Sequence, residues 1–92
     1  MLNERIKQLR TSRGISQVEL ARMLNVTKQS VSNWENDNIL PSIEMLMKLA
    51  GVFSVSCDYL LGLDNRQYLE VTGLTDIQIS HIQQIIDDIK QA

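Results

Sequence analysis

The chain has very little of what extracellular, redox or all-β proteins depend on. Its 92 residues include one cysteine, one proline, four glycines and four aromatic residues. The single cysteine, Cys57, excludes an internal disulfide and a multi-cysteine metal site, and we expect its thiol to pack in or beside the core. So few turn-forming residues argue against the many hairpins of a β-sandwich. We therefore expect an all-α chain, forming one small domain with a short appendage.

Long apolar runs and catalytic patterns are also missing. The stretches VFSV and YLLGL fall far short of the about 20 residues that span a bilayer, and MLNER does not begin a secretory signal. His81 is the only histidine, Asp87 and Asp88 are adjacent and point apart on a helix, and no glycine-rich phosphate loop or metal-ligand spacing occurs. We expect a cytoplasmic protein with no membrane partner, no enzymatic activity, no metal and no cofactor.

The charge of the chain is unevenly distributed. The net charge of −2 by itself argues against a nucleic-acid binder. Residues 1–34, however, carry six basic and two acidic side chains, a net +4, whereas residues 35–92 carry three basic and nine acidic ones, a net −6. The N-terminal part could therefore face phosphate.

The sequence contains start and stop signals for the first two expected helices. A helix over residues 2–13 places its apolar side chains on one face and ends where Gly14 can adopt the left-handed conformation of a helix terminus. The second helix begins at Ser16, whose spacing to Glu19 is that of a capping box. It ends before Asn25, a residue type that tolerates positive φ, so a sharp turn can follow at once.

Three further helices are expected before residue 63. Each follows a hydroxyl side chain that can cap it: Thr27 before residues 28–36, Ser42 before residues 43 to 52 or 53, and Ser56 before residues 57–61. The apolar set of the fourth helix is expected to be Ile43, Leu46, Met47, Leu49 and Ala50. In the third helix we expect Val31 and Trp34 to face inward.

The opposite side of the third helix consists of hydrogen-bond donors and acceptors, namely Lys28, Gln29, Ser32 and Asn33. Amide side chains suit adenine edges and a lysine can reach guanine or phosphate, whereas an ordinary solvated helix usually carries Glu–Lys pairs. Composition alone still favours a polar surface without a special role, because exposed Gln, Ser and Asn are common.

A longer sequence pattern favours a DNA-binding role for this helix over an ordinary polar surface. The spacing of Leu20, Ala21, Leu24, Asn25, Val26, Val31 and Trp34 resembles the helix-turn-helix of the lambda-repressor and Cro-like DNA-binding family. The resemblance continues through WE at 34–35, LPS at 40–42, Leu46, LA at 49–50 and VSCDYLLG at 55–62, so it covers about two thirds of the chain. Asn25 and Asp37 stand where the family often has glycine, and both residue types tolerate left-handed geometry.

The resemblance implies a bundle of five short helices, in which the third enters the major groove of DNA and the second crosses the backbone. It assigns base contacts to Lys28, Gln29 and Asn33, with Ser32 as a weaker candidate. It assigns a phosphate contact to Gln17, and Thr27, Asn36 and Asn38 could donate to neighbouring phosphates. Arg10 and Glu35 match a family pair that links the first helix to the end of the recognition helix, and we expect this pair to be structural.

The C-terminal part is read as a connecting arm over residues 64–73 and a helix over residues 74–92, opened by a Thr-x-x-Gln capping box. One stripe of this helix is made of Ile79, Ile82, Ile85, Ile86 and Ile89. The stripe would be covered if the helix folded back on its own domain or if two chains paired about a two-fold axis. We favour pairing, because the five-helix bundle is complete without this segment and a lone isoleucine-rich helix is marginal in water.

Together these patterns predict a helix-turn-helix domain over residues 1–63 in an all-α, cytoplasmic and homodimeric protein. The expected function is sequence-specific regulation of transcription, as a repressor rather than an activator, through an inverted repeat in double-stranded DNA. The alternative is an antitoxin-like regulator whose C-terminal helix binds a protein partner.

Overall fold

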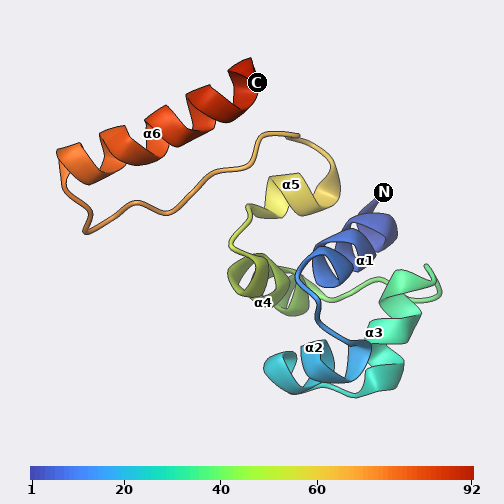
Figure 1. The fold of residues 1–92 in the computed structure, drawn as a ribbon. Coiled ribbons are helices and arrows are strands. Elements are labelled where there is room, and N and C mark those ends of the chain that lie inside the picture. The colour runs from blue at the N-terminus through green and yellow to red at the C-terminus, as the bar shows by residue number, and fades with distance from the viewer.

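Six α-helices and no strand make up the computed structural model, which describes all residues 1–92. They are α1 (Leu2–Ser12), α2 (Gln17–Leu24), α3 (Lys28–Glu35), α4 (Ile43–Phe53), α5 (Cys57–Leu61) and α6 (Asp76–Gln91). The first five helices pack together, and α6 stands apart at the end of an extended arm (Figure 1). The all-α prediction is confirmed. None of the helices has the length and hydrophobicity needed to span a membrane.

The predicted helix caps are formed. The Ser16 hydroxyl accepts a hydrogen bond from the Glu19 N–H at 3.0 Å, and the Glu19 carboxylate accepts one from the Ser16 N–H at 3.2 Å. Asn25 adopts the predicted left-handed conformation, with φ of 57°, at the end of α2. The hydroxyls of Thr27, Ser42 and Ser56 cap α3, α4 and α5 in the same way. These local signals therefore fix where each helix starts and how sharply α2 turns into α3.

The core lies where α1 to α5 meet. It comprises Ile6, Leu9, Leu20, Ala21, Leu24, Val31, Trp34, Leu49, Ala50, Phe53 and Leu60. Val31 and Trp34 face inward, as predicted. Cys57 is half-buried against this core, as also predicted. Every buried side chain of the core belongs to the bundle, so the bundle does not need α6 to complete it.

The predicted apolar set of α4 was partly wrong. Leu49 and Ala50 are buried, but Ile43 is 80% exposed and Met47 is 63% exposed. Met47 follows half-buried Leu46 by about 100° around the helix axis, which carries it off the contact side. Ile43 belongs to the first turn, next to a loop that is itself exposed. The position of the apolar residues in the sequence therefore did not identify the side of α4 that meets other helices.

Two arginines of the N-terminal segment fasten α1 to the last helices of the bundle. The Arg5 guanidinium donates to the Tyr59 carbonyl at 3.0 Å and lies 3.9 Å from the centre of the Tyr59 ring. The Arg13 guanidinium donates to the Phe53 carbonyl at 2.8 Å and lies 5.7 Å from the centre of the Phe53 ring. Phe53 is the last residue of α4, so its carbonyl has no hydrogen-bond partner within the helix, and the Arg13 guanidinium supplies one.

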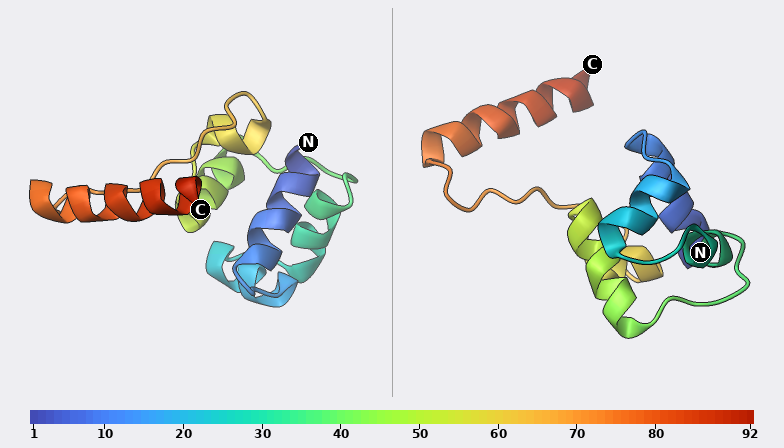
Figure 2. Two further views of the ribbon diagram at one scale, coloured as in Figure 1. Left: turned by 45° about the horizontal axis from the view of Figure 1, so that its top comes forward. Right: turned by 90° about the horizontal axis from the view of Figure 1, so that it is seen from below.

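α6 begins with the predicted capping box between Thr75 and Gln78, with bonds of 3.2 and 3.0 Å. None of its residues is buried. Ile79, Ile82 and Ile86 are half-buried, and the other two isoleucines of the stripe are exposed. The right view of Figure 2 shows α6 (orange to red) standing apart from the other helices and joined to them through the extended arm. The bundle of the same chain therefore leaves the isoleucine stripe largely open.

One glycine inside a helix offers a test of these helix assignments. Gly51 lies in α4, and a Cβ built on it meets no atom within 4 Å. Gly51→Ala should raise the free energy of unfolding by about 0.5–1 kcal/mol, because alanine loses less backbone entropy in a helix. Urea denaturation measures this change.

Gly14→Ala is the matched control. Its Cβ would also meet nothing within 4 Å, but Gly14 has a φ of 67°. This variant should lose about 1 kcal/mol, since L-residues with a side chain disfavour left-handed geometry. Equal effects of the two substitutions would contradict the conformational explanation.

Candidate nucleic-acid interface

A buried ion pair joins α1 to the end of α3. Arg10 donates from Nε to Glu35 Oε2 at 2.6 Å and from Nη2 to Glu35 Oε1 at 2.9 Å. Its third donor, Nη1, bonds the Ile15 carbonyl at 2.8 Å, just before α2. The side chains of Arg10 and Glu35 are 11% and 2% exposed. The structure thus brings together the two residues that the sequence paired, and Arg10 ties three segments around the start of α2.

The Glu35 carboxyl remains ionised in this buried position. Burial alone would raise its pKa, but hydrogen bonds from Arg10 and Gln17, with the charges of Arg10 and Lys7, outweigh burial and lower the pKa below its ordinary value. The hydrogen bond to Glu35 in turn raises the pKa of Arg10. The pair therefore holds opposite charges at neutral pH and orients α3 against α1.

Gln17, a predicted phosphate contact, is the first residue of α2 and belongs to the same network. Its Nε2 donates to Glu35 Oε1 at 3.2 Å. This bond uses one of its two amide hydrogens and leaves the other hydrogen and the carbonyl oxygen free. The N–H groups and dipole of the first turn of α2 favour an anion at the same place. Glu35 therefore positions the Gln17 amide beside this helix terminus.

The four predicted base-reading residues lie along the outward side of α3, away from buried Val31 and Trp34. Lys28 and Gln29 are exposed, and Ser32 and Asn33 are half-buried. Two hydrogen bonds link neighbours one turn apart: Gln29 Nε2 donates to Asn33 Oδ1 at 3.0 Å, and Asn36 Nδ2 donates to Ser32 Oγ at 3.2 Å. Gln29 is therefore joined to Asn33, and Asn36 to Ser32, along this side of the helix.

The remaining predicted phosphate contacts flank the two ends of α3. The Thr27 hydroxyl accepts from the Ser30 N–H at 3.1 Å as the N-terminal cap. Asn36 is the C-terminal cap, and the Asn38 N–H donates to the Asn33 carbonyl at 2.9 Å. Asp37, between them, has a φ of 58°. The chain thus reverses directly after α3 and leaves two exposed asparagine side chains beside it.

Fewer cations are available to phosphate than the six basic side chains of residues 1–34 suggest. Arg10 is paired with Glu35, and Arg5 and Arg13 are occupied by α5 and α4. The basic side chains of the N-terminal part that form neither an ion pair nor a side-chain hydrogen bond are Lys7, Arg22 and Lys28. Lys7 is close enough to Glu35 to lower its pKa, although the sequence did not single it out. Lys7 lies one helical turn before Arg10, so the sequence already placed both residues on the same face of α1.

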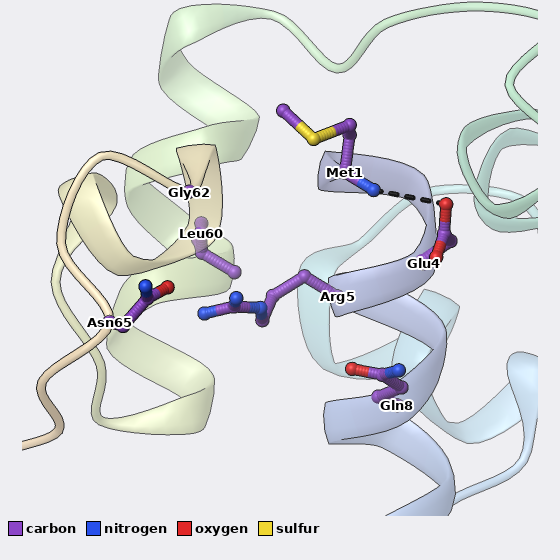
Figure 3. Close-up of a pocket in the computed structure, with 7 residues that line it drawn as sticks. All are labelled: Met1, Glu4, Arg5, Gln8, Leu60, Gly62 and Asn65. Atoms are coloured by element: carbon purple, nitrogen blue, oxygen red, sulfur yellow. Dashed lines mark hydrogen bonds and ion pairs between the residues drawn. The ribbon is translucent and has the colours of Figure 1, made fainter.

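A hollow of about 260 Å³ lies between α1, α5 and the arm (Figure 3). Its lining residues come from α1, α5 and the arm, with none from α2 or α3. Arg5 reaches across it towards Leu60 and Asn65, and the terminal amine of Met1 bonds Glu4 at 3.1 Å. Its principal cation, Arg5, is already engaged by Tyr59. The predicted nucleic-acid contacts therefore share no residue with this hollow.

The family model described as Helix-turn-helix matches residues 6–60, which span the core of α1 to α5. The HTH-type transcriptional regulator ImmR of Bacillus subtilis is 36% identical over 88 residues, covering 95% of this chain and 69% of ImmR. The P22 c2 repressor, from a Salmonella phage, was solved in complex with a synthetic operator. That structure has a TM-score of 0.66 and 34% identity, covering 70% of this chain and 97% of that chain.

A second similar structure is the complex of SinR protein with SinI protein, with a TM-score of 0.64, 28% identity and coverage of 100% of both chains. SinR is an HTH-type transcriptional regulator of Bacillus subtilis. The matched segment, the five-helix bundle and the sharp turn between α2 and α3 agree with one another. The chain belongs to the lambda-repressor-like helix-turn-helix family.

Proposed function

We propose that this chain is a sequence-specific DNA-binding transcriptional regulator, acting as a repressor in the cytoplasm and without catalytic activity. In this proposal α3 enters the major groove and α2 crosses the phosphate backbone above it. The observation that carries it is the outward side of α3, where amide side chains are ordered by hydrogen bonds. The Arg10–Glu35 pair supports it by fixing α3 and Gln17 together.

The relatives support a regulator of this kind. ImmR and SinR are named transcriptional regulators, and the P22 C2 protein is named a repressor. The P22 c2 structure in complex with a synthetic operator belongs to a protein that shares the fold and 34% of the aligned residues. Base contacts are assigned to Lys28, Gln29, Ser32 and Asn33, and phosphate contacts to Gln17, Thr27, Asn36 and Asn38.

We further propose that the protein binds an inverted repeat as a homodimer joined through α6. The isoleucine stripe of α6 is left largely open by its own bundle, and an isolated helix of this length is marginal in water. Pairing of two copies would cover both stripes about a two-fold axis. The second candidate is an antitoxin-like regulator whose α6 binds another protein, and the SinR–SinI complex is the observation that favours it.

Base and phosphate contacts predict different mutational effects. Gln29→Ala should reduce discrimination at particular base pairs by about 1–3 kcal/mol, as expected for a bidentate contact. Gln17→Ala should weaken all DNA sequences about equally, because a phosphate contact positions the protein without reading a base. The measurement is the affinity of each variant for a selected operator and for its single-base variants.

The wild-type protein is its own control in this experiment. It should bind DNA selected from a random pool more tightly than the unselected pool at every salt concentration. Equal binding to both pools would refute sequence-specific regulation, whatever the variants do.

A further inference from the structure

Gln29 and Asn33 are joined by their side chains as well as by their place on α3. Gln29 Nε2 donates to Asn33 Oδ1 at 3.0 Å, across one turn of the helix. Neither side chain is buried, so no surrounding core fixes these amides from outside. Each amide is oriented by the other, and this determines which donors and acceptors each one presents.

Gln29 keeps the groups that adenine requires. One of its two amide hydrogens is used by Asn33, which leaves the second hydrogen and the Oε1 acceptor. Adenine offers a donor at N6 and an acceptor at N7 in the major groove, so it matches this pair of groups. Guanine offers only acceptors on the same edge, and Oε1 would then face an acceptor.

Asn33 keeps mainly hydrogen-bond donors. A free asparagine would also match adenine, but here Oδ1 already accepts the hydrogen bond from Gln29. One lone pair of Oδ1 remains, but both hydrogens of Nδ2 are free, so the unengaged groups of Asn33 are mainly donors. A base edge made of acceptors suits such groups best, and guanine presents two acceptors, O6 and N7.

We propose that Gln29 and Asn33 act as one coupled reading unit that selects adenine at the base facing Gln29 and guanine at the base facing Asn33. This inference rests on the proposed function. Four residues advance about 6 Å along a helix, and successive bases are about 3.4 Å apart, so the two selected bases lie within two steps of each other.

Because of this hydrogen bond, a substitution of Asn33 should change the preference at both bases, whereas two independent contacts would change only one. Asn33→Ala removes the acceptor that orients Gln29, so guanine preference should disappear and adenine preference at the other base should also fall, by about 2- to 10-fold. Asn33→Asp keeps an acceptor oxygen for Gln29 but has no hydrogens to donate. It should retain the adenine preference and lose the guanine preference.

The experiment is selection of bound sequences from a random pool, followed by affinities for single-base variants of the selected site. The full chain is used for the wild type, Asn33→Ala and Asn33→Asp, with circular dichroism to verify folding. Gln84→Ala is the matched control, because Gln84 Nε2 likewise donates across one helical turn, to Asp88 Oδ1 at 2.9 Å, but on α6, away from the predicted DNA contacts and off the isoleucine stripe. It should leave both base preferences unchanged.

The outcomes separate this inference from the proposed function. Selection of adenine and guanine at nearby positions, with both preferences reduced by Asn33→Ala, supports the coupled unit. Selection by the wild type with Asn33→Ala changing a single position would refute the coupling and leave the regulator intact. No selection by the wild type would refute both.

Discussion

A chain ending at Leu63 is expected to keep the five-helix bundle and to lose about 10²- to 10⁴-fold in affinity for an inverted repeat whose half-sites lie one helical turn apart. The bundle should persist because every core residue lies between Ile6 and Leu60 and no residue of α6 is buried. Affinity should fall because the second half-site is no longer bound in an intramolecular step. Sedimentation should report a monomer, and affinity for a single half-site should change little.

Single substitutions in the full chain give a sharper version of this test. Ile82→Asp and Ile86→Asp place a charge in the stripe, where pairing with a second copy would desolvate it, so both should dissociate the dimer. Ile77→Asp is the control, because Ile77 lies off the stripe, is 70% exposed and belongs to the first turn of α6, where an acidic side chain is favourable. A full-length chain that stays monomeric at high micromolar concentration would refute pairing and favour the antitoxin-like alternative.

Arg10→Met is expected to lower the free energy of unfolding by about 3–5 kcal/mol. The substitution leaves the Glu35 carboxylate buried without its cation and the Ile15 carbonyl without its donor. Urea denaturation measures the loss. Glu44→Ala is the contrasting control, since it breaks the exposed pair of Glu44 with Lys48 at 3.5 Å and should change stability by less than about 1 kcal/mol.

The double variant Arg10→Met with Glu35→Leu should recover most of that stability, because it removes both charges and no buried ion remains unpaired. Its acid behaviour should differ as well. The pKa of Glu35 is below its ordinary value in the folded protein, so its contribution is complete above about pH 4.5 and is lost as the pH falls through the folded-state pKa. The difference in stability between wild type and double variant should shrink in that acidic range. A difference independent of pH would contradict the ionised assignment.

The features that the sequence predicted well are local. The capping boxes at Ser16 and Thr75 and the left-handed turn at Asn25 depend on residues within one helical turn, and all are formed. The family resemblance added the bundle and its order of helices. It also identified the Arg10–Glu35 pair, which joins residues 25 positions apart.

The features that the sequence missed depend on distant contacts. Arg5 appeared as a free cation until the fold placed it against Tyr59, 54 residues away. Ile43 and Met47 appeared as core residues because their apolar character is visible in the sequence and the position of neighbouring helices is not. On α3 the polar side was predictable, but the hydrogen bond between Gln29 and Asn33 depends on rotamers that sequence spacing alone does not determine.

Residues 62–75 set how far apart two bundles joined through α6 can stand. Fourteen residues span about 20 Å on average as a random coil and about 45 Å when fully extended, so two such segments can bridge half-site centres about 34 Å apart. A tether does not fix the spacing as a rigid interface would, and one inserted base pair rotates a half-site by only about 35°. The operators of this protein within one genome are therefore expected to differ in spacer length, and a motif search that assumes a fixed gap would overlook some of them.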